Sequence, residues 1–377
     1  MSEDLKTEAA QAGDLGDVDW VARALTLVPQ IEAAANDIEK GRQVTDAVMA
    51  ALHEQAMFKM FLPRSIGGGE ATPMEYARVM EVIGGADAST AWCLGQALGC
   101  SLASAHLDRD VALDVFGPKN AVLAWGPARG GAKARAVDGG YKSSGLWMFV
   151  SGLPQATWVG GHCILCDADG EPSLDKDGKP VTRTMLMPIS SAKIIDVWHV
   201  LGLRGTGSNN YEVKDVFVPE AYTMWRENVD EIRETGALYR IPIVTAYGFG
   251  FSGLALGLAQ AMLDEFMKLA LQKKARGFSM TLSENPVIQS EFSLERYKIL
   301  RPTFHVDEAF AELMRDHILI IGFGPSGRAV GEALIEHADR VVVVDLNPQL
   351  IKTAQRLGLR AQLGDARYGE ILDHLYL

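Results

Sequence analysis

The hydrophobic periodicity of this chain changes at three places, and these changes limit the folds that it can adopt. Apolar residues recur every three or four positions up to about residue 117, which predicts helices. Between Ala121 and Val218 they alternate or form β-branched runs between glycines, which predicts strands. Helical spacing returns at Leu238, and strand and helix patterns alternate after about residue 316. This order predicts an α+β protein followed by a short α/β unit.

The same changes divide the chain into five segments. Residues 1–16 are acidic and polar and are expected to form a disordered tail. We expect an N-terminal helical domain (17–117), a central β domain (118–232), a partial C-terminal helical bundle (233–312) and a partial Rossmann-like βαβαβ unit (315–377). Within the helical domain, Thr45 is expected to cap one helix and Pro73 to open another.

Composition narrows the partners. The 377 residues are 48% hydrophobic and 22% charged, with a net charge of −12, which argues against nucleic acid or an anionic membrane as a partner. Four cysteines are too few for a disulfide framework, and the acidic start is unlike a signal peptide, so a cytoplasmic protein is expected. We expect no metal site, because Cys163 and Cys166 form a single CxxC without a second pair.

One uncharged segment is long enough to cross a bilayer. Residues 241–263 contain no charged side chain. The segment is rich in glycine and lacks flanking aromatic belts and a basic cluster on one side. We therefore predict a buried helix of a large core and no membrane span.

The stretch 139–152, GGYKSSGLWMFVSG, predicts a glycine turn and a strand. Because strand side chains alternate, one face is expected to carry Tyr141, Ser143, Gly145, Trp147, Phe149 and Ser151. An aromatic face that ends in a hydroxyl suits a planar heterocycle. An ordinary half-buried strand explains the same pattern.

Four motifs occur in an order that resembles the acyl-CoA dehydrogenase superfamily, in particular its flavin-dependent monooxygenase branch, the oxygenase components of two-component systems. They are FLPRSIGGGE (61–70), EVIGGADASTAW (81–92), GGYKSSGLWMFVSG (139–152) and VLGLRGTGSNNYEVKDVFVPE (200–220). The resemblance covers residues 17–300. It implies an N-terminal helical domain, a central β domain and a C-terminal bundle, with flavin between the sheet and the bundle.

Particular residues favour the monooxygenase branch over the dehydrogenases. The loop WGPARGGAKA (125–134) replaces the acidic loop of the dehydrogenases, and Trp147 stands where they have a lysine. Dehydrogenases also need a glutamate base late in the bundle. The candidates Glu284, Glu291, Glu295 and Glu308 lie in no motif that identifies such a base. An acyl-CoA dehydrogenase-like oxidoreductase remains the alternative.

The resemblance implies reduced FMN or FAD, O2, a small organic and preferably aromatic substrate, and a separate flavin reductase as partner. It implies catalytic roles for Ser151 and Trp147, with Ser151 hydrogen-bonded near the reactive edge of the flavin. The implied flavin-binding residues are Trp125, Trp147, Ser151, Gly152, Arg204, Thr206, Ser208, Arg276 and Gln289. A homo-oligomer is expected if the bundle is intact.

The last 60 or so residues carry a second signature. Gly322, Gly324 and Gly327 follow the strand pattern ILII and open a helix, and Asp345 closes the next strand. This context predicts a dinucleotide site that favours NAD over NADP. The segment resembles half of a TrkA-type, RCK nucleotide-binding module, in which Asp365 is also implied to bind NAD. An NAD-binding regulator of potassium transport is therefore a further alternative.

These two resemblances do not normally share a chain. The bundle pattern stops after about two helices, and the nucleotide-binding pattern stops before its second half. We expect a fused or recombined chain with its junction near residues 300–316.

Overall fold

The computed structural model divides the chain into two compact units, Met1–Ile299 and Leu300–Leu377. In the first unit it describes residues 15–16, 18–226, 228–274, 280–285 and 287–289. In the second it describes 318–321, 323, 328, 331–332, 334–335, 338, 341–345 and 347–363. The expected helix from Pro286 onward, apart from residues 287–289, and the expected junction lie outside the described residues.

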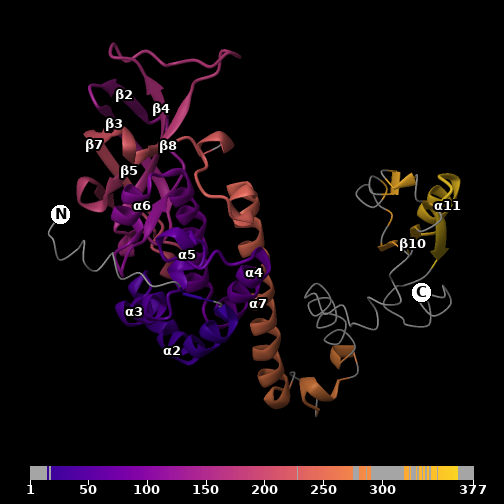
Figure 1. Ribbon diagram of the computed structural model, residues 1–377. Coiled ribbons are helices and arrows are strands. Elements are labelled where there is room, and N and C mark those ends of the chain that lie inside the picture. The colour runs from indigo at the N-terminus through magenta and orange to yellow at the C-terminus, as the bar shows by residue number, and fades with distance from the viewer. Residues whose placement is uncertain are drawn as a thin grey trace. The chain divides into compact units, whose positions relative to one another are not determined.

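A helical layer begins the first unit (Figure 1), as the periodicity predicts. Its α-helices are α2 (Trp20–Gly41), α3 (Asp46–Glu54), α4 (Pro73–Ala86), α5 (Ala88–Ser101) and α6 (Arg109–Phe116). The Thr45 side chain caps α3 by accepting from the backbone N–H of Val48. A capping box formed by Thr72 and Glu75 opens α4, with Pro73 in its first turn, so the predicted start signals are confirmed.

The central β region is one eight-stranded sheet in the order β6-β7-β3-β2-β4-β5-β8, with β1 paired to β4. The strands are β1 (Leu123–Trp125), β2 (Lys133–Val137), β3 (Gly140–Val150), β4 (Trp158–Cys166), β5 (Thr182–Pro188), β6 (Lys193–Ile195), β7 (Asn209–Pro219) and β8 (Thr223–Met224). Short 3-10 turns occupy residues 57–59, 64–66, 102–106, 153–155, 189–191, 204–206, 220–222, 229–231, 237–240 and 282–284.

The strand β3 does not keep the simple alternation that the sequence predicts. Trp147 pairs with Tyr211 of β7 and Val150 pairs with Asn209, so β3 carries one extra residue between these pairs. Phe149 lies at this bulge with φ 55°, in the left-handed region. Trp147 is 0% exposed whereas Phe149 is 56% exposed. The prediction of one continuous aromatic face is therefore wrong.

A single long helix, α7 (Ile243–Gln272), follows the sheet and lies alongside α4 (Figure 1). The two helices approach closely at glycines, because a Cβ on Gly253 would lie 2.0 Å from the Ala77 carbonyl oxygen and one on Gly257 2.0 Å from that of Glu81. The helix is long and apolar enough to cross a membrane by length and composition, but this is weak evidence for a span.

The prediction that α7 is buried holds for one of its sides only. The side toward α4 and α5 includes the buried Gly250 and Leu254. Elsewhere α7 exposes apolar side chains, namely Val244, Phe249, Phe251, Leu258, Met262, Met267, Leu269 and Leu271. The physical reason is that an uncharged helix is buried on all sides only where other elements cover every face of it. Among the described residues, other elements cover only part of α7.

The second unit contains a parallel sheet in the order β11-β10-β9. Its elements are β9 (Ile318–Ile321), β10 (Val341–Asp345), α11 (Pro348–Arg356) and β11 (Arg360–Leu363). Asn347 caps α11 by accepting from the N–H of Gln349. The apolar run of β10 is wholly buried at Val341, Val342 and Val343, as its sequence predicts.

Candidate functional site

The end of β3 brings three of the predicted site residues together. Gly152 has φ 71°, and its N–H donates to the backbone carbonyl of Thr206 at 2.8 Å. This contact places Ser151 beside the RGTGS loop, whose Thr206 and Ser208 are both buried. Two segments more than 50 residues apart in sequence thus meet at one point.

The hydroxyl groups at this point form a continuous chain. Ser151 Oγ lies 2.8 Å from Ser208 Oγ, and Ser208 Oγ lies 2.7 Å from Thr206 Oγ1. Thr206 Oγ1 donates to the carbonyl oxygen of Leu203 at 2.9 Å. Beside the chain, Cys93 donates from Sγ to the Thr206 carbonyl at 3.6 Å. Burial raises the pKa of the Cys93 thiol to about 12, so this thiol stays protonated at neutral pH.

An indole from α5 completes this arrangement. The Nε1–H of Trp92 donates to Ser151 Oγ at 2.9 Å. The Trp92 ring stacks on Phe251 of α7, with centroids 4.9 Å apart and planes at 12°. A stacked indole has a fixed orientation, so its N–H points reliably at the serine.

A second indole joins the sheet to α7. Trp125 of β1 donates from Nε1 to the hydroxyl of Tyr247 at 3.1 Å. The Tyr247 ring crosses α5 at Gly99, where a Cβ would lie 2.2 Å from the ring. Burial raises the pKa of Tyr247 well above its usual value, so the phenol stays protonated. The predicted residue Trp125 is therefore placed between the sheet and α7, with its polar atom already bonded.

Trp147 lies deeper in the sheet than a residue that lines a flavin site was expected to lie. Its ring is fully buried and stacks on Tyr211, with centroids 4.9 Å apart and planes at 13°. The structure therefore places Trp147 in the core of the sheet, and its role at a flavin stays a prediction. The aromatic side chain that the bulge presents outward is Phe149, which lies edge-on to Trp198 with centroids 6.3 Å apart.

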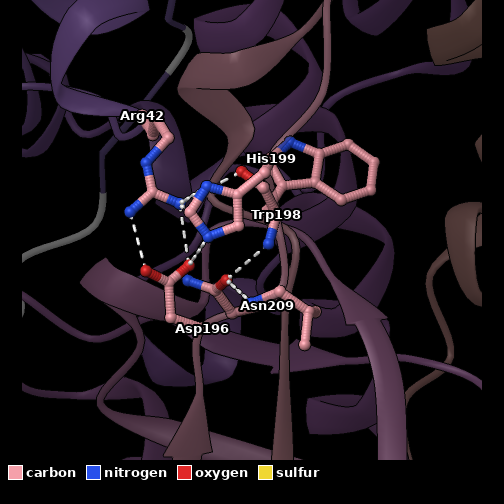
Figure 2. Close-up of polar contacts among 6 residues, drawn as sticks. Arg42, Asp196, Trp198, His199 and Asn209 are labelled. Carbon is pink, nitrogen blue, oxygen red and sulfur yellow. Dashed lines mark hydrogen bonds and ion pairs between the residues drawn. The ribbon is translucent and has the colours of Figure 1, made fainter.

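A polar network holds the loop that leads into RGTGS (Figure 2). Arg42, at the end of α2, makes two 2.7 Å bonds to the carboxylate of Asp196 and donates to the Trp198 carbonyl at 3.2 Å. His199 Nε2 lies 3.5 Å from Asp196. Asn209 Oδ1 accepts from the backbone N–H groups of residues 197 and 198. The hydrogen bonds from Arg42 lower the pKa of Asp196.

The other residues predicted to bind flavin are Arg204, Gln289 and Arg276, and only Arg204 belongs to the RGTGS loop. Arg204 lies on the same loop, with Nε 3.7 Å from a carboxylate oxygen of Glu39. Gln289 donates from Nε2 to the Ser283 carbonyl at 2.7 Å, within the segment that follows α7. Arg276 lies outside the described residues.

The predicted NAD residues are only partly described. Gly322, Gly324, Gly327 and Asp365 lie outside the described residues. Asp345 ends β10, and its carboxylate accepts from the N–H of Phe323 at 2.5 Å and from that of Asn347 at 2.7 Å. The carboxylate thus ties Phe323, which lies shortly after β9, to the end of β10.

Two family models match parts of the chain. Residues 26–107 match the acyl-CoA dehydrogenase N-terminal domain, and residues 318–377 match the TrkA-N domain. Among solved structures, XiaF from Streptomyces sp. in complex with FADH2 and glycerol aligns with a TM-score of 0.68 at 24% identity, covering 82% of this chain and 77% of XiaF. The 3-HSA hydroxylase from Rhodococcus sp. RHA1 aligns with a TM-score of 0.62 at 22% identity, covering 90% and 88%.

The first unit has an acyl-CoA dehydrogenase-like fold.

The names of curated relatives that match the first unit agree with the predicted branch. The flavin-dependent monooxygenase oxygenase subunit HsaA of Rhodococcus jostii is 31% identical over 248 residues, which are 63% of this chain and 62% of HsaA. The FADH(2)-dependent resorcinol hydroxylase oxygenase component of Rhizobium sp. is 28% identical over 306 residues, 78% of this chain and 72% of that protein. The matches to the first two relatives span 62% and 63% of those proteins.

The sequence interpretation missed three side chains of this site. Trp92, Tyr247 and Phe251 supply its indole donor and its aromatic rings. A usable signal was present, because Tyr247 and Phe251 are four positions apart in an uncharged helix and therefore share a face.

Proposed function

We propose that the first unit is the oxygenase component of a two-component flavin-dependent monooxygenase. It takes reduced FMN or FAD from a separate flavin reductase and uses O2 to hydroxylate a small aromatic substrate. The observation that carries the proposal is the partly exposed Ser151 hydroxyl, held by Trp92 and Ser208 beside aromatic side chains of α5 and α7. The relatives' names, which include a resorcinol hydroxylase and an indole-3-acetate monooxygenase, support an aromatic substrate.

The residues present fit a flavin. Phe149 is exposed on the bulge of β3 and meets Trp198 edge-on, which offers an apolar border for a planar ring. Ser151 has two lone pairs, of which Trp92 occupies one. The network around Asp196 fixes the loop that carries Trp198 and leads into RGTGS. A flavin would thus find an aromatic border and a hydroxyl, both held by bonds within the unit.

When bound, reduced flavin supplies the electrons that activate O2, which no side chain can do. The protein's own residues have three tasks. Ser151 meets the reactive edge with a fixed hydroxyl. Phe251 holds the Trp92 ring by stacking, so that the indole N–H stays on that hydroxyl. Tyr247, whose raised pKa keeps its proton in place, accepts from Trp125 and so joins the sheet to α7.

Glu284 is the one candidate for a dehydrogenase base within the described residues, and its surroundings argue against a dehydrogenase. Glu284 is exposed in a capping box, where its carboxylate accepts from the N–H of Thr281 at 2.6 Å. These bonds lower the pKa of Glu284, which makes it a weaker base. The other three candidates, Glu291, Glu295 and Glu308, lie outside the described residues.

For the second unit we propose NAD binding, with Asp345 at the ribose. The order β11-β10-β9 of parallel strands and the TrkA-N match support this proposal. A cytoplasmic location accords with both proposals, since the four cysteines of the chain are free thiols.

One experiment tests both units. The melting temperature of the full chain is measured without oxygen in reduced FMN, reduced FAD or NAD. We expect a reduced flavin to raise it, because a ligand at one hundred times its Kd adds about 2.7 kcal/mol of stability. Oxygen and a phenol are then admitted to the flavin sample, and the hydroxylated product is measured by mass spectrometry. A rise with NAD and none with either flavin would remove the monooxygenase proposal.

A further inference from the structure

The chain of hydrogen bonds through Ser151 has two ends whose chemistry fixes its direction. At one end, the indole N–H of Trp92 can only donate. At the other end, the carbonyl oxygen of Leu203 can only accept, here from Thr206 Oγ1 at 2.9 Å and also from Trp198 Nε1 at 3.0 Å. Three hydroxyls lie between these ends, and each has a single proton to donate.

Counting protons determines the orientation of every hydroxyl. The links are 2.9 Å from Trp92 to Ser151, 2.8 Å to Ser208, 2.7 Å to Thr206 and 2.9 Å to Leu203. The four hydrogen bonds need four protons, and one indole proton and three hydroxyl protons supply them if every hydroxyl donates toward Leu203. In this orientation Ser151 donates its proton to Ser208.

The reverse orientation is unfavourable. If Ser151 donated into the site, Ser208 would have to donate to Ser151, and Thr206 to Ser208. Thr206 Oγ1 and the Leu203 oxygen would then face each other at 2.9 Å with no proton between them. Thr206 and Ser208 are buried, so water cannot relieve this repulsion easily.

We propose that Ser208 and Thr206 are positioning residues that turn the proton of Ser151 away from the site, so that Ser151 accepts a hydrogen bond from its ligand. This inference rests on the proposed function. Reduced flavin carries an N–H at the edge nitrogen beside its reactive carbon, whereas oxidised flavin carries a lone pair there. A serine that offers a lone pair selects the reduced form, and Trp92 maintains this selection by occupying the other lone pair.

The first test measures the dissociation constants of oxidised and of reduced FMN and FAD, the latter without oxygen, for the full chain. Ser208→Ala frees the proton of Ser151, so we expect the preference for reduced over oxidised flavin to fall about five- to tenfold. Thr206→Val should lower it in the same direction, and Thr206→Ser should restore it. Ser104→Ala, which removes a buried hydroxyl bonded to the Ser101 carbonyl, is the matched control and should leave the ratio unchanged.

An unchanged ratio in Ser208→Ala, in a protein that binds flavin, would overturn the inference while leaving the proposed function intact. A neutron diffraction map of the perdeuterated protein decides the same question without flavin. We expect the deuteron between Ser151 and Ser208 to sit on Ser151. A deuteron on Ser208 that points to Ser151 would overturn the inference, even if neither form of flavin binds and the proposed function fails. If Ser208→Ala does not fold, this map of the unaltered chain still decides.

Discussion

The end of β3 and the helix α7 both contribute to the candidate site, but they differ in how far the rest of the unit satisfies their side chains. At the end of β3 each hydroxyl from Ser151 to Thr206 has a partner within the unit. On α7, one side packs on α4, while apolar side chains such as Met262, 66% exposed, have little cover among the described residues. A buried polar group without a hydrogen bond would destabilise the fold, so these hydroxyls are bonded within the unit. The exposed apolar surface of α7 does not prevent folding and is available to a partner.

The largest test acts on the sheet. Trp147→Ala should lower the free energy of unfolding by about 3–5 kcal/mol, because it removes a fully buried ring that stacks on Tyr211. Phe149→Ala, two positions away, is the control and should cost less than about 1 kcal/mol, since Phe149 is exposed. Urea unfolding measures both. Equal losses would contradict the assignment of Trp147 to the core and Phe149 to the surface.

The packed side of α7 can be broken in a similar way. Gly253→Ala should cost about 1–3 kcal/mol, because the added Cβ meets the Ala77 backbone at 2.0 Å and α4 must move away. Gly248→Ala is the matched control on the same helix. It meets nothing within 4 Å and should stabilise the protein by about 0.5–1 kcal/mol through helix propensity. If Gly253→Ala stabilised the protein as Gly248→Ala does, α7 would not pack on α4 as described.

Lowering the pH should destabilise the helical layer through His53. The hydroxyl chain should not contribute to this pH dependence, because its hydroxyl groups do not titrate near neutrality. Burial, and then the charge of Lys119, lower the pKa of His53 from 6.5 to about 4. Because the pKa of His53 is lower in the folded state than in the unfolded state, the neutral ring contributes to the free energy of unfolding above pH 6.5. This contribution is lost as the pH falls toward 4.

The matched variant is His53→Gln. Its unfolding free energy should fall by about 1–2 kcal/mol less than that of the unaltered chain between pH 6.5 and 4, since partial exposure of the ring reduces the full effect. Denaturant titrations at several pH values measure the difference. Identical pH profiles would exclude His53 as the source.

The smallest effect on folding is expected on the exposed side of α7. Met262→Glu should change the unfolding free energy by less than about 0.5 kcal/mol, because the side chain has few contacts to lose. It should also lower self-association in sedimentation velocity, since it interrupts an apolar surface. A large loss of stability would show that Met262 is covered.

The sequence predicted the elements well because periodicity and capping are local. Thr45, Pro73 and the run of β10 lie where their patterns placed them. It failed at Phe149, since an extra residue in β3 is decided by its pairing with β7 and leaves no mark in the alternation. It also missed the bond from Trp92 to Ser151, which joins positions 59 apart. Such contacts depend on the tertiary arrangement of α5 and β3.

The ion pair of Arg42 and Asp196 also bears on the order of folding. It joins positions 154 apart, one at the end of α2 and one just after β6. Contacts across so long a span cost loop-closure entropy and form after local structure has repaid part of it. The RGTGS loop should therefore settle late, once the helical layer and the sheet already exist, and its loss should be an early event in unfolding. A completed hydroxyl chain would then report that both layers have folded.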